Sequence, residues 1–225
     1  ASVMTDNAKA STEVATHMVE SLGDAGQVVV IAHDSKSLTS QERVNNFIAE
    51  IQNNHPNMSV AGPYYMDQID DIKKTIAEQQ LDIVPVEGQE LDEEQQTALN
   101  DAIAQITDED IYNYILEMNP DVKGIFATNG DTTMQALTAC EGKDMKDVVI
   151  MGYDADQEEI DAMKDGRIAG MIVQNPYGMG YATVVAEARC ALNMGNEANV
   201  NTGYTWVTPD NIEDRTVQDI LYAEK

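Results

Sequence analysis

The segment Gln27-Val28-Val29-Val30-Ile31-Ala32 is apolar almost throughout. A strand with one wet face alternates apolar and polar residues, whereas a strand of a parallel sheet is covered on both faces and is apolar along its whole length. The segment therefore predicts a buried strand of a parallel sheet. Further strands are expected at residues 58–61, 124–127, 148–151 and 170–173.

Amphipathic segments lie between these strands. In residues 8–22, Val14, Met18 and Leu22 recur at spacings of four, as on one face of a helix. Residues 40–51 repeat the pattern, and residues 133–140 and 158–163 are shorter helices. Regular alternation of strand and helix predicts an α/β fold with a doubly wound, mainly parallel sheet between two helical layers.

The rest of the chain departs from this simple alternation. A long helix is expected from Tyr177 to Met194, a strand at residues 203–208, and a polar tail with one short helix. Residues 66–117 hold fifteen acidic residues, two lysines and no arginine. We interpret this segment as an acidic helical insertion at about residues 67–106, packed on the outside of the lobe. Its charged face is either a solvated surface or a docking surface for a partner.

Within that acidic segment, residues 81–88 could be a short strand or an extended loop. Residues 91–106 are expected as a helix with Asp92 as its cap, and residues 108–118 as a second helix ended by Asn119-Pro120.

The net charge of -27 argues against two classes of partner. Such a surface repels the phosphates of nucleic acids and the headgroups of anionic membranes. No apolar run is long enough to cross a bilayer. The cysteines, Cys140 and Cys190, are expected to be buried thiols, with a disulfide as the alternative. No cofactor and no metal are expected, because the histidines lack metal-ligand spacing.

Polar side chains follow the predicted strands where each strand ends. They are His33, Tyr65 with Tyr64 and Met66, Asn129, Asp154 and Gln174, and Arg43 lies on the helix after the first strand. Ligands of open α/β sheets bind beyond the carboxyl ends of the strands. Carboxylate, amide and guanidinium groups suit a polyhydroxylated ligand, and an aromatic residue or Met can cover its apolar face. The alternative is that Asp and Asn merely cap the following helices.

Several motifs resemble the carboxy-terminal lobe of ribose-binding-type periplasmic binding proteins, the type I sugar-binding proteins of ABC transporters. They occur in the order of that family and cover nearly the whole chain. The motifs are Val3-Met4-Thr5-Asp6-Asn7, Glu42-Arg43-Val44-Asn45-Asn46-Phe47, residues 119–129 (Asn119-Pro120-Asp121 through Asn129), Ile150-Met151-Gly152-Tyr153-Asp154-Ala155, and Gly170-Met171-Ile172-Val173-Gln174-Asn175-Pro176.

This resemblance implies a function and a set of contacts. The residues at positions 43, 129, 154 and 174 would hydrogen-bond a monosaccharide, with His33, Tyr65 and Met66 as further candidates. The protein would capture a pentose or hexose between two lobes for ABC-type uptake or chemotaxis, and would present it to a membrane permease. It would be extracytoplasmic, either periplasmic or lipid-anchored outside a Gram-positive cell, with its signal peptide removed. It would not be an enzyme.

The resemblance also implies how the chain divides. Residues 1–174 would form the carboxy-terminal sugar-binding lobe, residues 175–203 would belong to the amino-terminal lobe, and residues 204–225 would return to the first lobe. Most of the amino-terminal lobe is then expected to be missing, and the exposed half-cleft favours self-association. Departures from the family pattern include Asn46 where Gly is usual and Gly130 where Asp is usual.

Two other functional classes remain as alternatives. The same fold serves as the effector-binding core of lac-repressor-type transcription regulators, although no helix-turn-helix is visible in the sequence. A small α/β enzyme or phosphorelay domain would need a nucleophile with its base, or a phosphoacceptor cluster. Neither a nucleophile elbow nor a phosphate-binding glycine loop is present.

Overall fold

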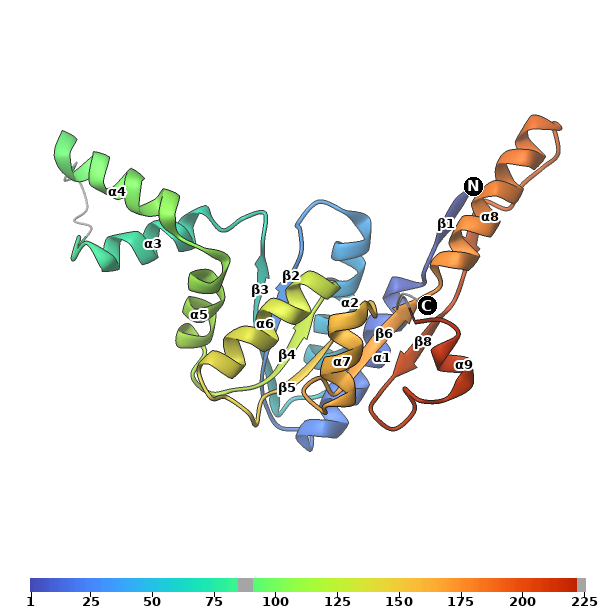
Figure 1. Ribbon diagram of the computed structural model, residues 1–225, viewed down its shortest axis with the longest axis horizontal. Helices are drawn as coiled ribbons and strands as arrows, with labels where there is room; N and C mark the ends of the chain where they lie inside the picture. The colour runs from blue at the N-terminus through green and yellow to red at the C-terminus, as the bar shows by residue number, and fades with distance from the viewer. Residues whose placement is uncertain (85–90, 222–225) are drawn as a thin grey trace.

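The computed structural model describes residues 1–84 and 91–221 and has a six-stranded sheet at its centre (Figure 1). Its strands are β2 (Gly26–Ala32), β3 (Met58–Tyr65), β4 (Val122–Ala127), β5 (Val149–Tyr153), β6 (Gly170–Gln174) and β8 (Tyr204–Val207). They lie in the order β3-β2-β4-β5-β6-β8. Neighbouring strands are parallel except β6 and β8, which are antiparallel. The predicted doubly wound, mainly parallel sheet is confirmed.

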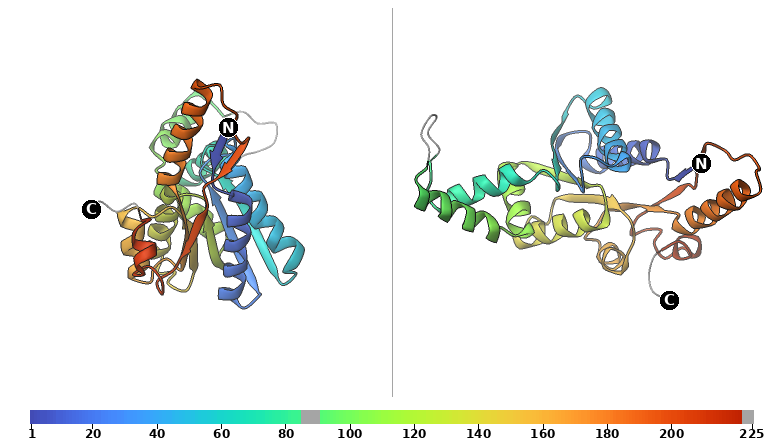
Figure 2. Two further views of the ribbon diagram at one scale, coloured as in Figure 1. Left: turned by 90° about the vertical axis from the view of Figure 1, so that its right-hand side faces the viewer. Right: turned by 90° about the horizontal axis from the view of Figure 1, so that it is seen from above.

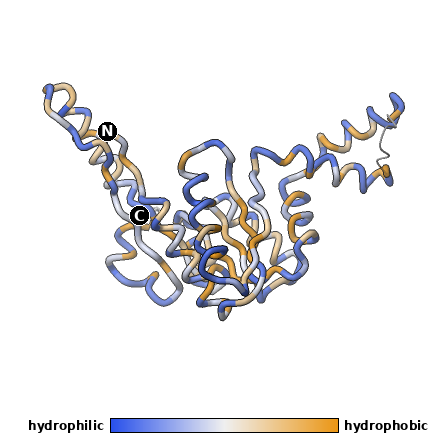
Figure 3. Tube along the Cα trace, turned by 180° about the vertical axis from the view of Figure 1, so that it is seen from behind, coloured by the Kyte–Doolittle hydropathy of each residue, from blue (hydrophilic) through white to orange (hydrophobic). Residues whose placement is uncertain are grey.

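Helices cover both faces of this sheet (Figure 2). Helices α1 (Asn7–Leu22) and α2 (Leu38–Asn54) lie on one face, and α5 (Asp108–Met118), α6 (Gly130–Gly142) and α7 (Gln157–Lys164) lie on the other. Val28 and Val30 of β2 face α1 and α2, whereas Val29 and Ile31 face the opposite helical layer. This two-sided burial explains why the β2 segment is apolar throughout, and the central strands are correspondingly hydrophobic in Figure 3.

A second, smaller unit lies beyond the carboxyl ends of the sheet strands. It consists of β1 (Ser2–Met4) and β7 (Asn199–Asn201), which pair in parallel, and of helix α8 (Pro176–Ala191). The chain crosses between the two units three times, from β1 to α1, from β6 to α8 and from β7 to β8. A short helix, α9 (Arg215–Gln218), lies near the carboxyl end of the described residues.

The acidic insertion forms an arm. Helices α3 (Asp70–Gln80) and α4 (Glu93–Gln105) pack on each other and extend away from the sheet (Figure 1). Only the base of the arm joins the main core, through Ile69, Ile72, Ile76 and Ile106. The expectation that the insertion packs on the outside of the lobe therefore holds only at its base. Leu99 is the buried residue of α4.

Two further sequence predictions are resolved in part. Residues 81–84 follow α3 as a turn, but the rest of the expected strand or loop at residues 81–88 lies outside the described residues. Cys140 is buried as expected, whereas the prediction of burial is wrong for Cys190. Cys190 lies on α8, which has no buried residue. Within the described ranges, no helix combines the length and the apolar character that crossing a bilayer requires.

We predict that the two thiols differ sharply in reactivity. Burial, and secondarily the charge of Glu141, raise the pKa of Cys140 to about 11, so little thiolate exists at pH 8. Ellman's reagent should therefore modify Cys190 quickly and Cys140 only after unfolding in urea. The Cys190→Ser variant is the control, and rapid modification of this variant under native conditions would contradict the buried position of Cys140.

Candidate functional site

Three of the predicted ligand-binding residues form one hydrogen-bonded network. The Nε2 group of Gln174 donates to Oδ1 of Asp154 at 2.8 Å. Nη2 of Arg43 donates to Oε1 of Gln174 at 3.1 Å. These side chains come from α2, from the loop after β5 and from the end of β6, so the parallel strands bring them to one edge of the sheet as expected.

Arg43 is the buried centre of this network. Its residue is only 4% exposed, and its guanidinium group lies 3.9 Å from the centre of the Tyr153 ring. Nε donates to Oδ1 of Asn7 at 2.8 Å, and Nη1 donates to the carbonyl oxygen of Thr128. Guanidinium stays charged at every physiological pH, so these acceptors and the ring face are what compensate for its burial.

Asp154 is held from two sides. Its Oδ2 accepts a hydrogen bond from the Gly130 backbone N–H at 3.2 Å, while its Oδ1 accepts from Gln174. Its backbone has φ of 79°, in the left-handed region that Asp tolerates better than most residues. Asp156, rather than Asp154, caps α7. The alternative interpretation of Asp154 as a simple helix cap is therefore wrong.

Asn129 has a different role from its three neighbours. Its Oδ1 accepts from the backbone N–H of Thr132 at 3.1 Å and from the Thr132 hydroxyl at 2.7 Å. The first contact belongs to the cap of α6, which is completed by the Asn129 backbone N–H donating to Oγ1 of Thr132 at 3.3 Å. The capping interpretation is therefore correct for Asn129, and a role for the same residue in ligand binding stays a prediction.

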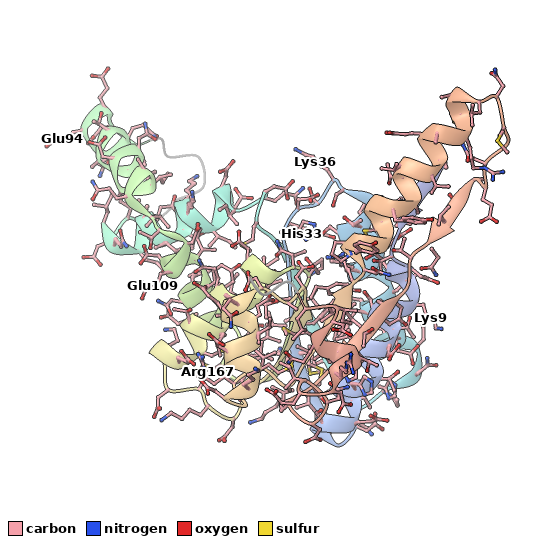
Figure 4. All side chains as sticks on the ribbon, turned by 45° about the vertical axis from the view of Figure 1, so that its right-hand side comes forward. Lys9, His33, Lys36, Glu94, Glu109 and Arg167 are labelled. Atoms are coloured by element: carbon pink, nitrogen blue, oxygen red, sulfur yellow. The ribbon has the colours of Figure 1, made fainter. Side chains whose placement is uncertain are left out.

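Asp154 and Gln174 line a hollow of about 620 Å³, and a second hollow of about 230 Å³ lies at other candidate residues. His33, Met66, Asn129 and Tyr112 are among the lining residues of the second hollow. Figure 4 shows His33 at the upper end of the sheet, between the arm that carries Glu94 and helix α8, with Arg167 toward the opposite end of the lobe. This is the place where the sequence predicts the ligand.

The candidates for apolar contact differ in how they lie. Met66 lines the second hollow. Tyr64 packs into the core beside α5, and its hydroxyl accepts from Nδ2 of Asn119 at 2.9 Å. Tyr65 packs against the core cluster on the α1 and α2 side of the sheet, and burial raises its pKa.

His33 lies closer to the ligand position than the other histidines do. Its Nδ1 lies 2.8 Å from the hydroxyl oxygen of Thr128. Burial, with a second contribution from the Arg43 cation, lowers the pKa of His33 below its ordinary value. The ring is therefore neutral at pH 7 and can both donate and accept a hydrogen bond.

Sequence reasoning missed the residues that tie the network to the chain crossing. The Thr5 hydroxyl donates to Oε1 of Gln174 at 3.1 Å, and Asn7 holds Arg43. Thr5 and Asn7 are each 1% exposed. Their position in the Val3–Asn7 motif was a signal, but a sequence does not show which buried polar groups meet. Within residues 1–84 and 91–221, no three His, Cys, Asp or Glu side chains gather as potential metal ligands.

We predict that Arg43→Lys lowers the free energy of unfolding by about 2–3 kcal/mol, because lysine cannot donate in three fixed directions. Urea denaturation measures this change. Arg167→Lys is the matched control, since Arg167 makes exposed ion pairs with Glu141 and Asp165, and its effect should stay below about 1 kcal/mol. Equal effects of the two substitutions would refute the anchoring role of Arg43.

The chain is also similar in sequence to known proteins. Over 66 residues the chain is 35% identical to the ribose import binding protein RbsB of Salmonella typhimurium. This match covers 29% of this chain and 22% of that protein. A stretch of 71 residues is 35% identical to RbsB of Haemophilus influenzae, covering 32% and 24% of the two chains. The matches thus span less than a quarter of these relatives.

Solved structures share the fold over a longer range. An ABC transporter solute-binding protein from Agrobacterium vitis, solved with bound D-fucose, superposes with a TM-score of 0.75 at 24% identity, over 98% of this chain and 64% of that one. A second, solved with α-D-tagatopyranose, gives 0.74 at 20% identity, over 99% and 63%. The model of the family described as periplasmic binding protein domain matches residues 1–191. The chain belongs to this periplasmic binding protein family.

Proposed function

We propose that this chain forms the sugar-binding face of a solute-binding protein that captures a monosaccharide for ABC-type uptake or chemotaxis. The observation that carries the proposal is the network of Arg43, Asp154 and Gln174. Asp154 and Gln174 lie at the carboxyl ends of β5 and β6, and Arg43 lies on α2, the helix that follows β2. It combines a permanent donor, a carboxylate acceptor and an amide that does both. Its relatives named for ribose import, and fold neighbours solved with D-fucose and α-D-tagatopyranose, support the same ligand class.

In this proposal the ligand hydroxyls add to a network that already exists. The Asp154 carboxylate accepts from ligand hydroxyls, and Arg43 donates from a guanidinium that keeps its charge. Gln174 and Asp154 currently satisfy each other at 2.8 Å, so a hydroxyl entering between them would replace that contact with one bond to each. Asn129 and His33 would add contacts from the hollow of about 230 Å³ that they line, and Met66 would cover an apolar ring face.

We further propose that β1, β7 and α8 belong to a second lobe, which would close over the sugar. Support comes from exposed apolar side chains on α8, namely Tyr177, Tyr181, Val184 and Val185, which recur three or four positions apart or side by side. Tyr177 is 84% exposed, which is unusual for a large aromatic residue on a packed helix. Closing of such a lobe would bury the sugar and create the surface that a membrane permease recognises.

This arrangement assigns roles to two of the three crossings. Thr5 lies in the first crossing and contacts Gln174, which precedes the second. A sugar that rearranges Gln174 therefore acts directly on the segments about which two lobes would move. An extracytoplasmic position follows from this function, because ABC uptake starts outside the inner membrane.

We expect one or more monosaccharides from a panel of D-ribose, D-arabinose, D-fucose, D-tagatose and D-allose to stabilise the full-length protein. Binding to the native state raises the melting temperature by mass action, and calorimetry gives the affinity. The 225-residue chain alone should bind the same sugar more weakly, because it offers few residues of the second lobe. Absence of any shift across this panel at millimolar sugar would refute the proposal.

Substitution of Asp154 tests the site itself. Asp154→Asn keeps the size of the side chain but removes the charge, so affinity for the sugar should fall about tenfold or more, the equivalent of one charge-assisted hydrogen bond. Asp161→Asn, an exposed position on α7, is the matched control and should leave affinity unchanged. If the two variants bind sugar equally well, Asp154 is not a ligand contact.

A further inference from the structure

Glu159 places a carboxyl group inside the protein, behind the proposed sugar site. The residue is 0% exposed, in contrast to the many acidic side chains on the surface. Its Oε2 accepts from the backbone N–H of Asp156 at 3.1 Å, as part of the cap of α7. Its Oε1 is buried and has no hydrogen-bond partner within the part of the chain that the structure describes.

This carboxyl group lies directly against Gly130. A methyl group added to Gly130 would come within 3.0 Å of Oε2 and 3.2 Å of Cδ of Glu159. Gly130 in turn donates its backbone N–H to Oδ2 of Asp154. The three residues therefore form a continuous line of contact from the interior of the protein to the carboxylate proposed to bind sugar.

We propose that Glu159 is a positioning residue of the sugar site, whose carboxyl group fills the space beside Gly130 and holds the Gly130 amide against Asp154. The sugar-binding part of this inference rests on the proposed function, whereas the contact between Glu159 and Gly130 does not. Close packing makes the position of Gly130 depend on its neighbours as well as on the Asn129 cap of α6, because glycine has no side chain of its own.

The protonation state of Glu159 matters for this role. Its pKa is raised to about 8, chiefly by burial. The backbone hydrogen bond from Asp156 opposes this rise, and the charges of Asp156 and Asp154 add to it. The part of α6 that packs against this carboxyl group is the backbone of Gly130, which has no titratable side chain. Below pH 8 the neutral acid can stay near Asp154 without repulsion, whereas ionisation places a buried negative charge near that half-buried carboxylate.

Two substitutions of Glu159 separate packing from charge. Glu159→Ala removes the group that supports Gly130, so the affinity of the full-length protein for the best-bound sugar of the panel above should fall about tenfold at pH 6. Glu159→Gln keeps the size and neutrality, and should bind that sugar as the wild type does at pH 6. Between pH 6 and pH 9 the wild type should lose affinity, and Glu159→Gln should lose less.

A sugar-independent measurement accompanies this comparison. The amide nitrogen and proton signals of Gly130 should shift between pH 6 and pH 9 in the wild type and stay in place in Glu159→Gln. A double-mutant cycle, measured by melting temperature, adds a second check. Gly130→Ala should lower the melting temperature of the wild type because of the 3.0 Å contact, but should raise or preserve it in the Glu159→Ala background.

The outcomes distinguish this inference from the proposed function. Wild-type affinity in Glu159→Ala, or identical pH profiles for wild type and Glu159→Gln, would overturn the positioning role while leaving sugar binding intact. If no sugar of the panel binds the wild type, the proposed function fails, and the Gly130 signals still decide the contact. A melting-temperature cycle that is additive would show that Glu159 and Gly130 are not coupled.

Discussion

The arrangement of this protein depends on one buried cation. Arg43 is 4% exposed and cannot shed its proton, so its neighbours must supply acceptors wherever its donors point. They come from parts of the chain that are far apart, namely Asn7 in the first crossing, Thr128 after β4 and Gln174 at the end of β6. Loss of any acceptor would leave a buried charge incompletely compensated. A single side chain thereby holds the first crossing and two strand ends together.

This constraint explains why the candidate site and the chain crossings are one structure. Gln174 accepts from Arg43 and Thr5 and donates to Asp154, so its amide group uses both of its ends. A ligand that competes for Gln174 or Asp154 must change contacts that begin in the first crossing. In the proposed function, shared hydrogen bonds would link sugar binding to movement about the crossings, and a ligand-driven closure requires differential contacts of this kind.

Much of the fold could be predicted because its causes are local. Two-sided burial makes the central residues of β2, β4 and β6 apolar, and the cap of α4 is readable as Asp92. The edge of the sheet at which the polar residues meet follows from parallel pairing. Their partners could not be predicted, because both a cap and a ligand contact suit Asn129 in the sequence. The direction of the arm and the exposure of Cys190 depend on what each helix packs against. Amino-acid composition does not reveal these packing partners.

Gly130 shows how a departure from a family pattern can acquire a physical reason. The sequence alone presents it as a glycine where Asp is usual, without a cause. The structure puts Oε2 of Glu159 3.0 Å from where the Cβ of a side chain at position 130 would lie, so a larger residue there would require Glu159 to shift. A chain with a net charge of -27 keeps most of its carboxylates in water, where repulsion is screened. Glu159 has no such screening, and its raised pKa of about 8 is chiefly the consequence of burying an acid, to which the charges of Asp156 and Asp154 add.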